Sequence, residues 1–262
     1  MRTEVVGLDL RLRRRTLLGT ALGAAAYLLL VIAVYPSFRR DSGFDAMIAA
    51  NPAAAAAFGV SGSITSPAGW LGANMYANVA PLLALLLSIG YGAAAIAGQD
   101  DDGTLGLVTS LPLSRPEVLA QKAVVLWAVS LVVPLAALVT CVAGPAFQLS
   151  PDWGHLGWVT VSTALLAFDL GAVALLVGAL TGSRGVALGT ASSVAMVAYL
   201  VSALAPVVPA MGTVRWLSPF TWAVGNEQLA RGQTLGGMVA LVGLGVLLVG
   251  VTLPAFRRLD IH

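Results

Sequence analysis

The stretch GWVTVSTALLAFDLGAVALLVGAL, residues 157–180, decides the fold of this chain. It contains one charged side chain, Asp169, and about 20 apolar residues in a helix are enough to cross the hydrocarbon core of a membrane. Comparable apolar runs occur at about 17–35, 76–97, 122–147, 185–205 and 236–255. The sequence therefore predicts an all-α polytopic membrane protein, with six transmembrane helices in a single domain over residues 1–262.

The composition agrees with a chain that lies mostly in membrane lipid. Hydrophobic residues make up 58% of the chain and charged residues 10%, whereas ordinary soluble domains carry about 25% charged residues. The arginines flank apolar runs, which is typical of membrane flanks and gives no reason to expect a nucleic-acid partner. The single cysteine, Cys141, excludes an intrachain disulfide, and no metal site is expected.

The distribution of positive charge predicts the orientation, because Lys and Arg favour the cytoplasmic side of a membrane. An internal N-terminus places ten positive residues inside: Arg2, Arg11, Arg13, Arg14, Arg15, Arg115, Lys122, Arg184, Arg257 and Arg258. Only Arg39, Arg40, Arg215 and Arg231 then lie outside. No small-x-small cleavage pattern follows the first span, so it is expected to remain as an anchor. We therefore expect a multi-pass protein of the cell (inner or plasma) membrane, with both termini cytoplasmic.

The stretch VVGLDLRLRRR, residues 5–15, precedes the first span and has an amphipathic pattern. At helical spacing, one face carries Val5, Leu8 and Leu12 and another carries Arg11, Arg14 and Arg15. This pattern is typical of a helix lying in the cytoplasmic membrane interface. Alternatively, the arginines only orient the first span, and the sequence does not separate the two interpretations.

A charged insert, GQDDDGTLGLVTSLPLSRPEV at residues 98–118, separates the second and third spans on the predicted cytoplasmic side. Three acids precede a short helix that is expected to begin near Gly103 or Thr104, where they would face the positive end of the helix dipole: Asp100, Asp101 and Asp102. An apolar stripe follows at Leu105, Val108 and Leu111 before Pro112 ends the helix.

A second helix is predicted directly after this turn. Ser114 and Glu117 have the spacing of a capping box around Arg115 and Pro116, and proline is favoured in a first helical turn. A short helix between two rigid spans could transmit a push from a soluble partner. The alternative is an ordinary loop whose acids are merely solvated.

Two segments carry a resemblance to a known family. The stretch AIAGQDDDGTLGLVTSLPLSRPEVLAQK, residues 95–122, resembles the cytoplasmic segment between spans two and three of ABC-2 type permeases, the membrane subunits of ATP-binding cassette exporters. The stretch VRWLSPFTWAVGNEQLARG, residues 214–232, is similar to the segment between their fifth and sixth spans. The order of six spans and the long first outside segment agree, so the resemblance covers nearly the whole chain.

The resemblance implies that the chain is one transmembrane half, paired with a second, identical or homologous permease half. Separate ABC ATPase subunits would dock on the segment from Asp100 to Arg115 as a coupling helix and would carry ATP and Mg²⁺. The chain itself is expected to be no enzyme and to hold no cofactor, since its sole lysine does not lie in a P-loop motif. Residues 206–235 would form an outer re-entrant hairpin that includes Trp216, Ser218, Pro219, Phe220 and Trp222.

The function that we expect is outward movement of a hydrophobic or amphipathic compound of antibiotic or drug-like type. Asp169, near the middle of the fourth span, is a possible pathway residue, because an ionised acid there costs about 2.5–3.5 kcal/mol. It would bind a cation or carry a proton; alternatively, it is a protonated or hydrogen-bonded residue at a helix contact. An alternative function is an ion-coupled secondary transporter or a membrane-embedded enzyme that uses Asp169.

Overall fold

The computed structural model describes residues 4–51, 63–99, 114–225 and 228–258, and these ranges contain helices and turns but no strand. The all-α class predicted from the sequence is confirmed. The elements are α1 (Glu4–Phe38), α2 (Ser42–Ala49), α4 (Pro67–Leu71), η1 (Gly72–Tyr76), α5 (Val79–Ala93), η2 (Ala94–Gly98), α8 (Arg115–Thr140), η3 (Cys141–Phe147), α9 (Trp153–Thr181), α10 (Arg184–Leu204), α11 (Pro209–Gly212), η4 (Arg215–Leu217), α12 (Pro219–Ala223), α13 (Gln228–Arg231) and α14 (Leu235–Arg258).

Six helical stretches among the described residues are long and apolar enough to span a membrane, in agreement with the six predicted. They are Val5–Phe38, Pro67–Gly98, Arg115–Phe147, Trp153–Thr181, Arg184–Leu204 and Leu235–Arg257. Several of these helices extend beyond the predicted boundaries, because residues on either side of the apolar run continue the helix. The second includes π-helical turns at η1 and η2, and the third ends in the 3₁₀ turn η3.

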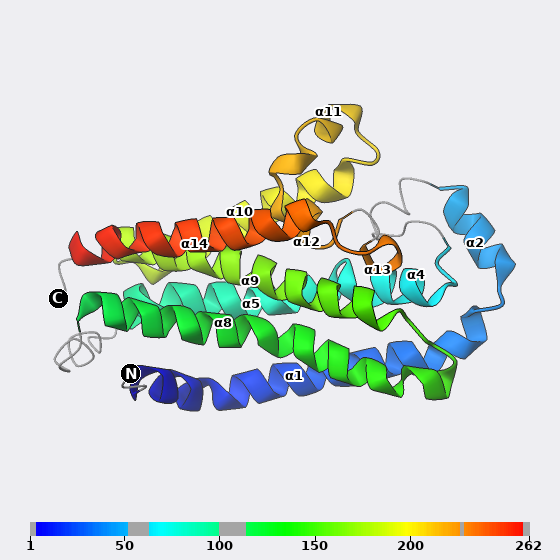
Figure 1. The fold of residues 1–262 in the computed structure, drawn as a ribbon, viewed down its shortest axis with the longest axis horizontal. Coiled ribbons are helices and arrows are strands. Elements are labelled where there is room, and N and C mark those ends of the chain that lie inside the picture. Colours follow the sequence, from blue (N-terminus) through cyan, green and yellow to red (C-terminus); the bar gives the residue numbers. More distant parts are fainter. Residues whose placement is uncertain (1–3, 52–62, 100–113, 226–227, 259–262) are drawn as a thin grey trace.

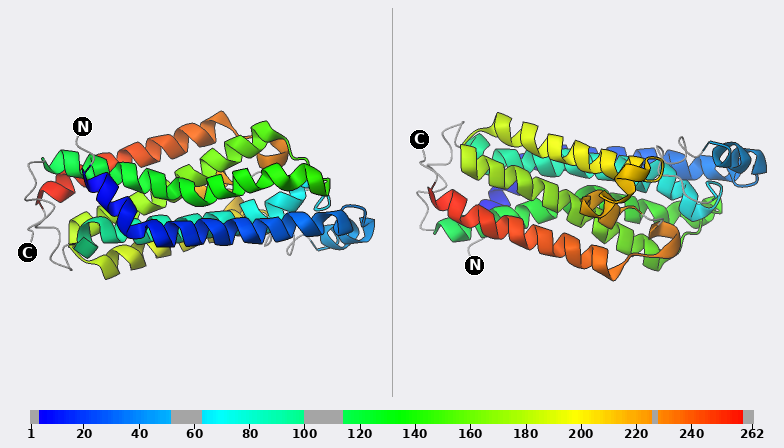
Figure 2. Two further views of the ribbon diagram at one scale, coloured as in Figure 1. Left: turned by 90° about the horizontal axis from the view of Figure 1, so that it is seen from below. Right: turned by 90° about the horizontal axis from the view of Figure 1, so that it is seen from above.

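The helices form one elongated bundle with two distinct ends (Figure 1). The first turns of α1 and α8 and the last turns of α14 lie at one end, whereas α2, α4 and α13 lie at the other (Figures 1 and 2). Helix α9 is central, since it packs against α5, α8, α10 and α14. Of the 18 most apolar consecutive residues of α9, 67% are buried, whereas only 22% of the corresponding residues of α10 and of α14 are buried. The outer helices therefore present most of their apolar surface to the surroundings.

Small residues let α5 and α9 approach closely, as is common where membrane helices pack. A Cβ atom added to Gly92 would collide with the carbonyl oxygen of Gly171. A Cβ atom on Gly171 would lie 2.6 Å from Cδ1 of Leu126 and 2.9 Å from the carbonyl oxygen of Ser88. Glycine is therefore required at both positions for the observed contact between these helices.

The start of the chain differs from the predicted separate interfacial helix. Residues 4–16 are the first turns of α1, which continues without interruption to Phe38. These turns are inclined to the rest of the helix (Figure 2, left). The helix continues because residues 4–35 contain no proline and Arg and Leu favour helix. Val5 is buried, whereas Leu8 and Leu12 are exposed, so the predicted apolar stripe is divided between protein and surroundings. A location in the membrane interface stays a prediction.

Local signals in the sequence fix the turns around α9. The carboxylate of Asp152 caps its start by accepting a hydrogen bond from the backbone N–H of His155 at 2.8 Å, which lowers the pKa of Asp152. Gly182 ends the helix with a positive φ of 63°, a conformation that favours glycine. Ser183 then caps α10. The chain thus reverses within two residues, and α10 packs beside α9.

Candidate functional site

The predicted coupling residues before position 114 lie outside the described residues, and their arrangement stays a prediction. They are Asp100, Asp101, Asp102, Gly103, Thr104, Leu105, Val108, Leu111 and Pro112. The structure does describe both flanks of this segment. The π-helical turns of η2 end at Gly98 with Gln99 as the C-cap, and α8 begins at Arg115. Both flanks lie at the end of the bundle where α1 begins (Figure 1).

The start of α8 has the capping box that the sequence predicts. The backbone N–H of Ser114 donates to Oε2 of Glu117 at 2.7 Å, and the backbone N–H of Glu117 donates to Oγ of Ser114 at 3.4 Å. Arg115 turns toward α14 and donates from Nη1 to the carbonyl oxygens of Phe256 and Arg257, both at 2.8 Å. Carbonyls in the last turn of a helix have no partner within the helix. Arg115 therefore ties the start of α8 to the end of α14.

Next to these flanks is a buried polar network that joins α1, α5, η2 and α8. Nζ of Lys122 lies 2.9 Å from Oδ2 of Asp9 and donates to Oε1 of Gln99, also at 2.9 Å. The hydroxyl of Tyr91 donates to the same Oδ2 of Asp9 at 2.8 Å, and Nε2 of Gln99 lies 3.5 Å from Oδ1. The side chain of Lys122 is 0% exposed and that of Asp9 is 5% exposed. Two opposite charges are thus enclosed where the bundle meets the undescribed segment.

Further contacts hold the surroundings of this pair. The guanidinium of Arg13 lies over the ring of Tyr91, with its carbon 5.0 Å from the ring centroid. The backbone N–H of Val5 donates to Oε1 of Gln121 at 3.2 Å. The first turns of α1 are therefore attached to both α5 and α8 by polar contacts as well as by apolar packing.

Sequence reasoning missed this network. The sequence analysis used Lys122 as one of the positive charges that set the orientation and as the sole lysine that lies in no P-loop motif, and it did not single out Asp9. The available signal was that Lys122 is the only lysine beside 13 arginines and stands at the start of an apolar run. A lysine in that position needs a partner when it is buried, because an unpaired charge in an apolar interior is costly.

The described part of the segment between α10 and α14 packs on α10. Oγ of Ser218 donates to the carbonyl oxygen of Ala198 at 2.6 Å, and Phe220 packs edge to face on Tyr199 with ring centroids 5.5 Å apart. Pro219 begins α12. Nε1 of Trp222 donates to the carbonyl oxygen of Trp216 at 2.8 Å. These contacts hold the described part of the segment against α10.

The aromatic residues of this segment are buried to different degrees. Phe220 is 2% exposed and Trp222 is partly buried, as expected for side chains that pack on the membrane domain. Trp216 differs, since 57% of it is exposed. The guanidinium carbon of Arg215 lies 4.6 Å from the centroid of the Trp216 ring. Re-entry of this segment into the membrane stays a prediction.

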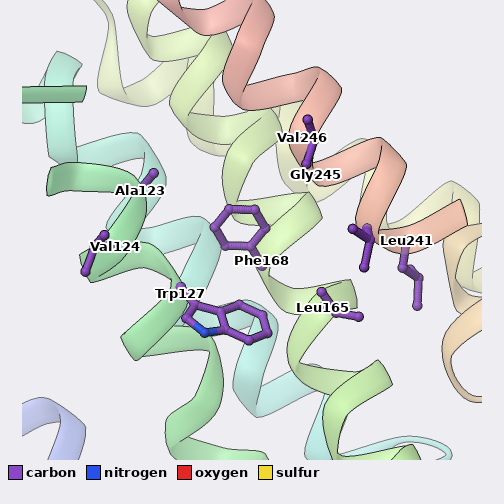
Figure 3. A pocket seen from close by; sticks show the side chains of 9 residues that line it. Ala123, Val124, Trp127, Leu165, Phe168, Leu241, Gly245 and Val246 are labelled. Atoms are coloured by element: carbon purple, nitrogen blue, oxygen red, sulfur yellow. The ribbon is translucent and has the colours of Figure 1, made fainter. Parts of the chain in front are cut away.

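An apolar pocket of about 370 Å³ lies between α8, α9 and α14 (Figure 3). Its lining consists of Ala123, Val124 and Trp127 from α8, Leu165 and Phe168 from α9, and Leu241, Val242, Gly245 and Val246 from α14. The rings of Trp127 and Phe168 meet edge to face, with centroids 5.7 Å apart and planes at 82°. The pocket is open to the surroundings on one side, since Val124, Val242 and Val246 of its lining are 52%, 49% and 69% exposed.

Asp169 lies beside this pocket but does not line it. The residue is 1% exposed, and neither carboxylate oxygen has a hydrogen-bond partner within the described ranges. A Cβ atom on Gly245 would lie 2.7 Å from Oδ1 of Asp169, so the glycine allows α14 to pass directly over the carboxylate. One alternative from the sequence was that Asp169 is hydrogen-bonded at a helix contact, and no such hydrogen bond is observed among the described residues. The arrangement suits an uncharged acid, since an ionised acid inside a span is costly without a partner.

Comparison with known proteins identifies the family. A family model described as ABC-2 family transporter protein matches residues 3–261, which is nearly the whole chain. A search of curated proteins finds no match. The family agrees with the six spans and with the resemblance of residues 95–122 and 214–232. Members of this family are multi-pass permease subunits, the transport component of an ABC transporter, and are not themselves catalytic. The family also implies an ATP-binding partner subunit. The chain therefore belongs to the ABC-2 family of transporter proteins.

Proposed function

We propose that this permease exports a hydrophobic or amphipathic compound of antibiotic or drug-like type. In this proposal, two identical or homologous halves form the pathway, and separate ATPase subunits bind ATP and Mg²⁺. Both termini and the segment from Asp100 to Arg115 lie in the cytoplasm, and the segment serves as the coupling helix. Residues 206–235, which include Trp216, Ser218, Pro219, Phe220 and Trp222, form the re-entrant hairpin on the outer side.

The pocket between α8, α9 and α14 is the observation that carries the substrate class. Its nine lining residues are eight apolar side chains and one glycine. An apolar compound gains about 25 cal/mol for each Å² of apolar surface that leaves water. The lining has no charged side chain, and the indole N–H of Trp127 is its one side-chain hydrogen-bond donor, so a polymer of sugars or a small ion would find few polar contacts there. The lining therefore supports a compound with a large apolar body.

Reconstitution tests this proposal. The chain is purified in mild detergent with the ATPase that accompanies it, which mass spectrometry identifies, and both are placed in vesicles with a fluorescent apolar compound. We expect ATP-dependent movement from the ATPase side to the opposite side. Movement in the reverse direction, or the same rate without ATP, would contradict the proposal.

Substitutions in the pocket test the substrate site separately. Ala123→Trp places a large ring among the lining residues and should reduce export at least tenfold while assembly with the ATPase stays normal. Val239→Trp is the matched control, because Val239 lies on α14 with 66% exposure and is not among the lining residues. Equal export by the Ala123→Trp variant and its control would show that the compound passes elsewhere.

The alternative function, an ion-coupled transporter or membrane enzyme, needs an ionisable group inside the membrane. Asp169 is the observation that favours it, because this buried carboxylate has no hydrogen-bond partner among the described residues. Such a transporter would move its substrate with a proton or sodium gradient and without the ATPase. Export by the ABC mechanism would continue when an ionophore removes the gradient.

A further inference from the structure

The buried pair Asp9–Lys122 joins three parts of the chain that meet at the proposed ATPase side. Asp9 belongs to α1, and Lys122 lies two helical turns after the start of α8. Gln99 is the last described residue before position 100, and it accepts a hydrogen bond from the same ammonium group. The helix that leads into the segment of residues 100–113 and the helix that follows it are thus attached to one point on α1.

Stability alone is a poor explanation for this pair. Removing two charges from water is unfavourable, and well-packed apolar side chains in place of a buried ion pair are often equally stable or more stable. The pair lies among apolar residues that could supply such packing, since Val118, Leu119, Val125 and Leu126 of α8 are all buried. The best-attested use of a buried charged group is to fix one register between elements.

The network has the geometry for such a fixed register. The ammonium of Lys122 bonds to acceptors on two different elements, and Oδ2 of Asp9 receives both the ammonium and the hydroxyl of Tyr91. A shift of one helix relative to the others would leave a buried charge without its partner, which is costly. The three parts are therefore expected to move together and not to slide past one another.

We propose that Asp9 and Lys122 are positioning residues that transmit displacement of the segment of residues 100–113 to α1. The inference rests on the proposed function, in which an ATPase moves that segment. When both ends of the segment shift, the ion pair carries the first turns of α1 along. Without the pair, the ATPase would still bind and hydrolyse ATP, but α1 would follow the movement less closely.

The test uses the complex of the full chain with its ATPase in vesicles, and measures compound exported per ATP hydrolysed. The double variant Asp9→Asn/Lys122→Met removes both charges together and retains similar side-chain volume, so no charge is left buried alone. We expect normal assembly and ATP hydrolysis, but at least a tenfold fall in compound exported per ATP. An unchanged ratio would overturn the inference and leave the pair a merely structural contact.

A milder variant keeps the test decisive if the double variant fails to assemble. Tyr91→Phe removes one 2.8 Å hydrogen bond to Asp9 and keeps the ring in place. We expect the export ratio to fall about threefold at normal assembly. Tyr76→Phe is the matched control, because Tyr76 is equally buried but its hydroxyl lies 3.4 Å from Thr160, away from this network. Equal ratios for the two tyrosine variants would overturn the inference.

These outcomes are distinct from failure of the proposed function. If the parent chain binds no ATPase or exports nothing with ATP, the proposed function is wrong, whatever the variants do. If the parent exports with ATP and the variants export with the same ratio, only the positioning role is wrong.

Discussion

Replacement of Lys122 alone should destabilise the protein strongly, whereas replacement of the whole pair should not. Lys122→Met leaves the carboxylate of Asp9 buried, with 5% of its side chain exposed and its only ion-pair partner among the described residues removed. Breaking one side of a buried pair typically costs about 3–5 kcal/mol, while apolar replacement of both partners is often neutral. The difference in the free energy of unfolding between the single and the double variant therefore measures the cost of leaving the Asp9 charge uncompensated.

The magnitude can be stated as a melting temperature. A change of 1 kcal/mol shifts the midpoint of thermal unfolding by about 2–4 °C in chains of 150–250 residues, so the loss for Lys122→Met is about 6–20 °C. The double variant Asp9→Asn/Lys122→Met should melt within about 4 °C of the parent. Arg14→Met is the control for loss of a positive charge, because Arg14 is exposed and such surface changes stay within about 0.5 kcal/mol.

The assay is thermal unfolding of the purified chain in one detergent, followed by intrinsic tryptophan fluorescence. The chain has six tryptophans, among them Trp127 on α8. If Lys122→Met melts like the parent or like Arg14→Met, the pair is not buried as described, and the reasoning about its role fails with it.

Further predictions concern single contacts. Gly171→Ala should lower stability by about 1–3 kcal/mol, because the added Cβ would lie 2.6 Å from Leu126, whereas Gly189→Ala, with no atom within 4 Å, should be neutral or stabilising; thermal unfolding separates them. Asp169→Asn should leave ATP-driven export within about twofold of the parent, since the carboxylate has no observed partner, and a complete loss at normal assembly would favour the ion-coupled alternative. Slight burial raises the pKa of Asp45, but hydrogen bonds from Thr65 and Ser63 outweigh it and hold the pKa below its usual value. This stabilisation is present above the ordinary pKa of 3.8 and is lost as pH falls through the lower folded value. The protection of the amides around residues 63–66, corrected for the intrinsic exchange rate at each pH, should therefore fall at low pH, but not in an Asp45→Asn variant.

The sequence predicted the features that depend on local composition. Six apolar runs predicted six spans, because the length of a run is set by membrane thickness and needs no knowledge of tertiary packing. The capping box of Ser114 and Glu117 was also predicted, because both partners lie within one helical turn. The family was indicated by two short stretches in the expected places.

The remaining features depend on contacts between distant residues. Asp9 and Lys122 are 113 positions apart, and their pairing follows from the way the first turns of α1 lie across α5 and α8. The pocket combines residues of α8, α9 and α14, and its apolar side chains are of the same types as the exposed apolar side chains elsewhere on these helices. The continuation of α1 through residues 4–16 could not be separated from an interfacial helix, because the same amphipathic pattern suits both.

The most direct test of the account is whether substrate stimulates ATP hydrolysis through residues 103–111. The complex of parent chain and ATPase in vesicles is compared with a Leu105→Asp variant, which places a charge in the proposed apolar contact, and with Asp101→Asn as a mild control worth about 0.3–1 kcal/mol. We predict that the exported compound stimulates ATP hydrolysis in the parent and the control. In the Leu105→Asp variant, the ATPase should fail to assemble or should hydrolyse ATP without stimulation. Stimulation and export at the parent level in that variant would contradict the account.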